Sequence, residues 1–175
     1  MDNPESKTNE LSIDSVLKKL HQFKDFDKLS KVHSDYINEI MISDEGYRLF
    51  FTGLKYSYEK DINHAISLYE KAVNLGNSKA MNNLANCYKN GEGVEKDINY
   101  AIELHEKAMN LGNSNAMYNL SLCYEFNKNI EKNIPKAIEL LEKAIKLDNN
   151  NKIFHKNFQR LIEKISFRIY SIFTI

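Results

Sequence analysis

The side chains best suited to chemistry in this sequence are two cysteines and five histidines. Cys87 and Cys123 could form a disulfide or bind a metal, but they lie 36 residues apart, the period of the sequence repeat described below. Equivalent positions of stacked helical units lie about 8–10 Å apart, whereas a disulfide requires Cα atoms within roughly 7 Å. Both thiols are therefore expected to be small side chains of the core.

None of the five histidines lies at metal-ligand spacing from a cysteine or a carboxylate within one helix. His105 aligns with Tyr69 and Leu141 at a position expected to be half-buried. A structural role is favoured for it, and a pH-sensitive spot is the alternative. The histidines are His21, His33, His64, His105 and His155.

Two glycines in the loop Gly91-Glu92-Gly93 could be mistaken for a phosphate-binding motif. A phosphate loop follows a strand and opens a helix, whereas these glycines follow a helical pattern with no strand nearby. They are expected to end a helix, where glycine is common. The spacing shows no Ser-His-Asp, Cys-His or paired-carboxylate arrangement, so we expect no catalytic residue, no metal and no cofactor.

An internal repeat of 36 residues positions these side chains. Residues 61–88 and 97–124 are identical at 20 of 28 aligned positions, and 133–149 match the second copy at 10 of 17. A fixed period of this length is typical of stacked supersecondary units, because one unit cannot bury its own apolar face. The repeat predicts an all-α fold, a short right-handed α-solenoid of antiparallel helix pairs.

Each unit is expected to contain two helices with defined ends. In the second unit, Ser78 is expected to cap the first helix and Asp97 the second. In the third unit, Asn127 and Asn129 replace the two loop glycines, and Pro135 falls in the first turn of the second helix. Alanines at two repeated positions should let helix axes approach closely. These are Ala65, Ala101 and Ala137, and Ala72, Ala108 and Ala144.

The composition limits the classes of function. A length of 175 residues predicts about one domain, and 42% hydrophobic residues suffice for a core. Lys plus Arg and Asp plus Glu both number 24, and this balance argues against nucleic-acid binding and a polybasic membrane module. Residues 1–10 are polar and no stretch reaches the roughly 18 apolar residues of a membrane span, so a cytoplasmic location is expected.

The repeat motif resembles a known family. The pattern A-x-x-x-L-x-x-x-Y-x-x-G-x-G-V-x-x-D from Ala80 to Asp97, followed by A-x-x-L-x-x-K-A from Ala101, is similar to the Sel-1-like repeat, a relative of the tetratricopeptide repeat. The first unit lacks the Gly-x-Gly loop and is more similar to a plain tetratricopeptide unit. The expected units are a tetratricopeptide-like repeat over 44–77 and Sel-1-like repeats over 78–113 and 114–149.

The ends of the chain are expected to cap the stack. We expect a disordered tail over 1–10, a helical cap over 11–43, and a capping helix with an apolar tail over 150–175. The last ten residues alternate like a strand, but with no partner strand expected they could continue the helix, form an adhesive tail or be the scar of a truncation. The apolar face of the C-terminal helix is expected to comprise Ile153, Phe154, Phe158, Leu161, Ile162 and Ile165.

The resemblance also implies a binding surface. In tetratricopeptide-like stacks the first helix of each unit lines a concave groove, and groove asparagines clamp peptide backbones, which suits a side chain that both donates and accepts. The chain contains 22 asparagines. An equal alternative is therefore that these asparagines are exposed, solvated side chains with no binding role. The expected groove residues, with Ser121 beside them, are Lys79, Asn82, Asn83, Asn86, Lys89, Asn115, Tyr118, Asn119 and Glu125.

The resemblance implies a non-catalytic interaction module, an adaptor or scaffold that binds a protein or peptide segment in this groove. Tyr118 is the aromatic side chain best placed to anchor the partner. A second hypothesis is a regulatory repeat fragment of a larger signalling protein such as a kinase, because similar repeats occur beside catalytic domains. A hydrolase is a remote third hypothesis, because the repeat proteins credited with that activity are rich in cysteine and this chain is not.

Overall fold

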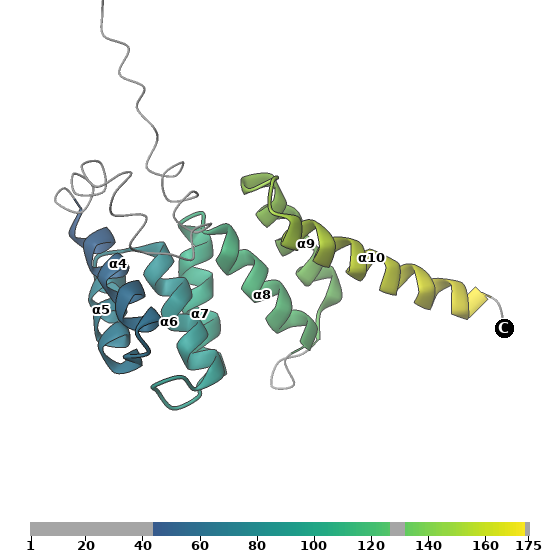
Figure 1. Cartoon of the computed structure of the whole chain (residues 1–175). Helices are drawn as coiled ribbons and strands as arrows, with labels where there is room; N and C mark the ends of the chain where they lie inside the picture. Colours follow the sequence, from purple (N-terminus) through teal and green to yellow (C-terminus); the bar gives the residue numbers. More distant parts are fainter. Residues whose placement is uncertain (1–43, 127–131, 174–175) are drawn as a thin grey trace, which may run out of the picture.

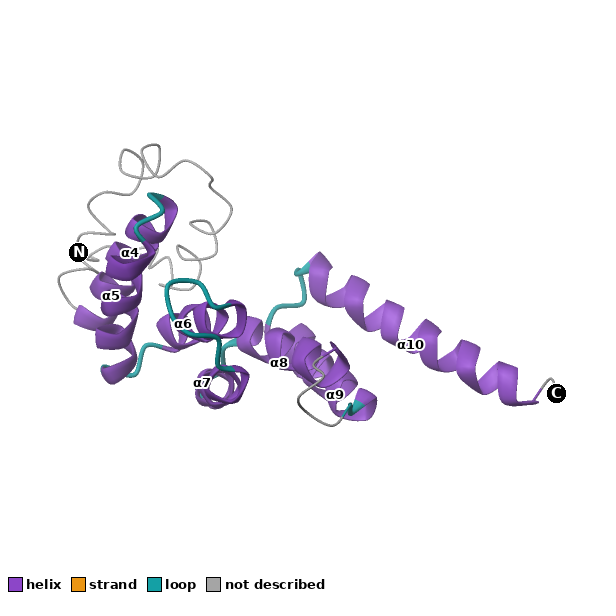
Figure 2. Cartoon of the chain, turned by 90° about the horizontal axis from the view of Figure 1, so that it is seen from below, coloured by secondary structure: helices purple, strands orange, loops and turns teal. Residues whose placement is uncertain are grey.

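The described part of the chain is entirely helical. The computed structural model describes residues 44–126 and 132–173, and these residues form helices joined by short loops, with no strand (Figure 2). The helices pack in chain order, and α4 with α5, α6 with α7 and α8 with α9 form the closest pairs (Figure 1). The predicted all-α repeat fold is therefore confirmed. The helices are α4 (Glu45–Tyr58), α5 (Ile62–Asn74), α6 (Ser78–Asn90), α7 (Ile98–Asn110), α8 (Ser114–Phe126), α9 (Ile134–Leu147) and α10 (Lys152–Phe173).

Each helix begins after an Asp or Asn whose side chain accepts a hydrogen bond from a backbone N–H of the first turn. Those N–H groups have no acceptor within the helix, so the cap stabilises the helix start. Asp97 caps α7 as predicted, 3.0 Å from the N–H of Tyr100. The prediction for α6 was wrong by one residue, because Asn77 accepts from the N–H of Ala80 at 2.9 Å and Ser78 is already helical.

The loop between α6 and α7 lies against α5. Gly91 ends α6 with φ 78°, and Gly93 in the loop has φ 70°. A Cβ atom at Gly93 would lie 2.6 Å from Ile62 and 2.7 Å from Ile66, so a larger residue cannot approach α5 this closely. Glycine is therefore required at 93 both for its backbone conformation and for the space around it.

Small side chains lie at the closest helix contacts. All six repeated alanines of α5, α7 and α9 are at most 1% exposed, as expected. Leu84 and Leu104 are buried with them, and so are both cysteines, neither of which forms a disulfide. Pro135 lies in the first turn of α9, where its missing N–H leaves no hydrogen bond unmade. The core of the repeats thus follows the sequence pattern closely.

The C-terminal helix packs on one side and projects at its end. Phe154 and Leu161 of α10 are buried against α8 and α9, whereas Ile153 and Ile162, expected on the same face, are exposed. Both views show the C-terminal part of α10 extending beyond the other helices (Figures 1 and 2). Residues 166–173 continue the helix, which is one of the alternatives for that segment.

Several expectations fall outside the described residues. They concern the tail over 1–10, the helical cap over 11–43, and the loop residues Asn127 and Asn129.

Candidate functional site

The expected groove residues all lie on α6 and α8, but their surroundings differ. Asn82, Ser121 and Glu125 are buried. Asn115 is exposed, and the remaining residues are half-buried. These three buried side chains are therefore not open to a ligand, contrary to the expectation for the groove. The half-buried residues are Lys79, Asn83, Asn86, Lys89, Tyr118 and Asn119.

Hydrogen bonds donated by asparagine side chains join α6 to α8. The Nδ2 of Asn119 donates to the Oδ1 of Asn82 at 2.9 Å. The Nδ2 of Asn113, just before α8, donates to the backbone oxygen of Ser78 at 3.0 Å. First helices of successive units therefore contact each other through amide side chains, and these asparagines stabilise the stack. We call this contact the α6–α8 junction.

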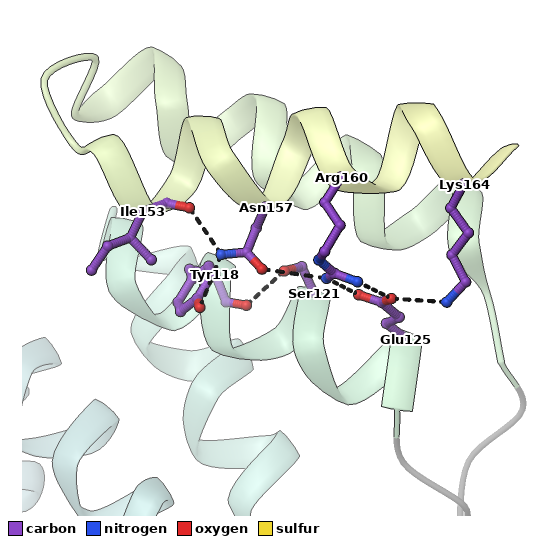
Figure 3. Close-up of polar contacts among 7 residues, drawn as sticks. All are labelled: Tyr118, Ser121, Glu125, Ile153, Asn157, Arg160 and Lys164. Atoms are coloured by element: carbon purple, nitrogen blue, oxygen red, sulfur yellow. Dashed lines mark hydrogen bonds and ion pairs between the residues drawn. The ribbon is translucent and has the colours of Figure 1, made fainter. Parts of the chain in front are cut away.

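A buried carboxylate joins α8 to α10. The side chain of Glu125 is 1% exposed and accepts two hydrogen bonds from Arg160, at 2.7 and 2.6 Å, and one from Lys164 at 3.2 Å (Figure 3). Burial alone would raise the pKa of Glu125, but the hydrogen bonds and positive charges of Arg160 and Lys164 outweigh it and lower the pKa below its ordinary value. Glu125 is therefore ionised at neutral pH, and we call this contact the α8–α10 junction.

Tyr118 belongs to the same junction. Its ring centroid lies 5.3 Å from that of Phe154, and its hydroxyl accepts a hydrogen bond from Asn157 at 3.3 Å (Figure 3). Ser121 is buried beneath α10 and donates to the backbone oxygen of Tyr118 at 2.7 Å. The α10 helix thus covers the side of α8 on which sequence analysis expected an anchor for a partner.

The polar face of α10 carries a signal that the sequence analysis missed. Asn157, Arg160 and Lys164 recur at the three- and four-residue spacing of one helix face, and each contacts α8. This pattern indicates a helix that packs on a polar neighbour.

The α6 helix keeps one buried polar atom that no described residue satisfies. Asn86 and Lys89 are half-buried and lie one helical turn apart. The Oδ1 of Asn86 is buried and has no hydrogen-bond donor within the described residues. A buried carbonyl oxygen without a donor is unfavourable by about 1–3 kcal/mol, so this position favours a ligand that brings an N–H group.

His105 on α7 is completely buried rather than half-buried as expected. Neither ring nitrogen has a hydrogen-bond partner within the described residues. Burial, with a smaller contribution from the charge of Lys89, lowers the pKa of His105 to about 3, so the ring is neutral at physiological pH.

The cysteines are poorly suited to nucleophilic chemistry. Burial raises the pKa of Cys87 to about 11 and also raises that of Cys123. The thiolate is the reactive form of cysteine, and it is disfavoured at both positions.

Within residues 44–126 and 132–173, no three His, Cys, Asp or Glu side chains gather in a group that could hold a metal ion. Among the described helices, none has the length and apolar character needed to cross a bilayer.

Solved structures share this fold. One is a Sel1 repeat protein from Oxalobacter formigenes, 21% identical, with a TM-score of 0.59 over 65% of this chain and 47% of that chain. Another is a protective antigen present in uropathogenic Escherichia coli strains, which displays an SLR fold. It is 25% identical, with a TM-score of 0.62 over 68% of this chain and 26% of that chain. This chain therefore spans less than half the length of either structure.

Comparison with curated proteins finds no match. The Sel1 repeat model matches residues 46–77, 78–113 and 114–149, and this includes the first unit, whose loop lacks the Gly-x-Gly element. The three matches cover more than half of the sequence, and the chain belongs to the Sel1 repeat family.

Proposed function

We propose that this chain is a non-catalytic adaptor or scaffold that binds a peptide or protein segment along the first helices of its repeats. Sel1 repeats are generally protein–protein interaction modules, and their fold is generally a non-catalytic scaffold. Stacked units of this kind offer an extended surface to a partner. To this general role of the family, we add that the partner binds along the first helices of the repeats and that the chain acts as an adaptor or scaffold.

The unsatisfied polar group on α6 carries this proposal. An extended peptide offers one N–H and one C=O per residue. The buried Oδ1 of Asn86 lacks a donor, and the ammonium of Lys89, one turn away, can donate to a carbonyl or a carboxylate. A peptide backbone lying across α6 would pair with Lys89 directly, and with the amide of Asn86 once that amide turns toward the surface.

The binding surface is narrower than the sequence analysis expected. At the positions equivalent to Asn86 and Lys89, α8 carries Leu122 and Glu125, and Glu125 is already paired with α10. The proposed binding surface therefore consists of Asn86 and Lys89 on α6 and the exposed Asn115 at the start of α8.

The test begins with affinity capture from the native cells, using the full chain as bait, followed by mass spectrometry. The dissociation constant of the captured protein is then measured for two double variants. Asn86→Ala with Lys89→Ala removes the proposed contacts. Lys107→Ala with Asn110→Ala removes the same residue types, at the same spacing, from exposed positions of the second helix α7.

We expect the α6 variant to bind the captured protein about tenfold more weakly, since it loses a charged and a neutral hydrogen bond. The α7 variant should bind like the unmodified chain. Equal affinities for all three proteins would place the binding site elsewhere and contradict the proposal. Circular dichroism of both variants checks that each remains folded.

A further inference from the structure

Charge is distributed unevenly among the described helices. The described side chains of α6, α8 and α10 include six cations and two anions, whereas α5, α7 and α9 carry five of each sign. Among these helices the positive excess lies mainly on α6 and α10, although the whole chain has a formal net charge of zero. The six cations are Lys79, Lys89, Lys152, Lys156, Arg160 and Lys164.

The two anions of these helices, the buried Glu125 and the exposed Glu163 of α10, do not offset the six cations fully. The ionised, buried Glu125 is paired with the two cations Arg160 and Lys164. This cluster of three side chains therefore keeps one net positive charge. The side chains of Arg160 and Lys164 are still 40% and 42% exposed. Lys156 lies one turn before Arg160 on α10 and is exposed, and Lys89 occupies on α6 the position that Glu125 has on α8.

We infer that the α6–α8–α10 face binds an acidic segment of a partner protein, with carboxylates of that segment placed against Lys89, Lys156 and the Arg160–Lys164 pair. The inference rests on the proposed function and specifies the chemistry of the partner. Complementary charge attracts such a segment and places it across the three helices. The half-buried Asn86, whose Oδ1 has no donor within the described residues, then pairs with the segment's backbone after its amide turns outward.

The same features disfavour other partners. The exposed apolar side chains described on α10 are Ile153, Ile162 and Phe167, and Ile153 and Ile162 lie on opposite sides of the helix. These side chains therefore do not gather on the single apolar face that enters a lipid surface. Nucleic-acid binding surfaces carry a larger excess of cations and belong to domains with a basic balance, unlike this chain.

Fluorescence anisotropy of labelled probes tests the inference on the full chain. The probes are a peptide of alternating Glu and Ala, the matched peptide of alternating Gln and Ala, and a single-stranded oligothymidylate. Lys89→Gln with Lys156→Gln removes two cations from the proposed face. Lys71→Gln with Lys107→Gln removes two exposed lysines from the second helices and changes the net charge equally.

We expect the acidic peptide to bind at low salt and to weaken at physiological salt, because the contacts are exposed charges. The K89Q/K156Q variant should bind it about tenfold more weakly, while K71Q/K107Q should change the affinity less than twofold. Equal losses in the two variants would show that only net charge matters and would overturn the inference.

Other outcomes separate this inference from the proposed function. Equal binding of the Glu and Gln peptides would overturn the acidic preference and leave the proposed function intact. Tighter binding of the oligothymidylate than of the acidic peptide would point to nucleic acid instead. If no probe binds, the inference fails, whereas the proposed function fails only if the α6 variant binds the captured protein with unchanged affinity.

Discussion

The α6–α8 and α8–α10 junctions join helices in the same way but use different chemistry. At the first, an amide of Asn119 donates to the amide of Asn82, and neither group is charged. At the second, Asn157 donates to Tyr118 in the corresponding place, and a buried Glu125 is added. The repeat geometry therefore decides which helices touch, while single substitutions at repeated positions decide whether a contact depends on charge.

This difference has a thermodynamic consequence. A buried carboxylate is stable only with its cations in place, because the desolvated charge has no other compensation. An amide pair that loses one partner leaves a single neutral group unsatisfied. We therefore expect the α8–α10 junction to be the more sensitive one to substitution.

The largest effect is expected for Arg160→Ala. It removes the two shortest hydrogen bonds of the buried Glu125, so the free energy of unfolding should fall by ~3 kcal/mol. Urea denaturation followed by circular dichroism measures the loss, and hydrogen exchange should show that it is concentrated in α10. The double variant E125L/R160M removes both charges and should be close to the unmodified chain. A loss as large as that of R160A in the double variant would contradict this account.

A pH titration should separate the contribution of the buried His105 from that of Glu125 at the α8–α10 junction. The pKa of His105 is lowered from 6.5 to about 3, so below pH 6.5 the unfolded chain binds a proton that the folded chain does not. The free energy of unfolding is therefore flat above pH 6.5 and should fall by about 2 kcal/mol on going to about pH 4.5. Glu125 contributes below this range, because its folded pKa lies below 4.5 and its stabilisation is lost as the pH falls through that lowered value.

His105→Leu is the control for this titration, since Leu141 occupies the equivalent position in α9. The variant should flatten the dependence between pH 6.5 and about pH 4.5 and should raise stability at neutral pH by ~1 kcal/mol, because it removes two unsatisfied ring nitrogens. An unchanged pH profile in H105L would show that other histidines cause the dependence.

A smaller effect is expected at the uncharged junction. Asn119→Ala removes the donor to the buried Asn82 and should lower the free energy of unfolding by ~1 kcal/mol. Asn115→Ala, an exposed asparagine on the same helix, is the matched control and should have little effect. If N119A destabilised the chain as strongly as R160A, the proposed difference between the junctions would disappear.

The smallest effect is expected for Lys143→Ala. Its ammonium lies 2.6 Å from Glu139, as close as Arg160 lies to Glu125, but both side chains are about half exposed. Solvent screens an exposed pair, so urea denaturation should show a loss below ~0.5 kcal/mol. A loss comparable to that of R160A would mean that distance, rather than burial, controls these ion pairs.

Much of the fold could be predicted from the sequence, because its signals are local. Asp97 is followed by a helical pattern and caps it, and Gly91 ends α6 in the left-handed conformation that glycine adopts readily. The capping error at Ser78 is of the same local kind, since Asn77 beside it is an equally suitable cap. The candidate site was harder to predict, because a polar residue on a helix surface can face solvent or a neighbouring helix.

The sequence by itself determined the number of repeats, the pairing of their helices and the alanines between them, because helical period and small side chains act over short distances. Only the tertiary structure decided that α10 covers Tyr118 and Glu125 while Asn86 and Lys89 stay half-buried, with no hydrogen bond or ion pair to the described part of α10. The reason is that α10 lies outside the repeated pattern. The contacts that it makes, between residues 35 to 39 positions apart, depend on where the whole stack places it.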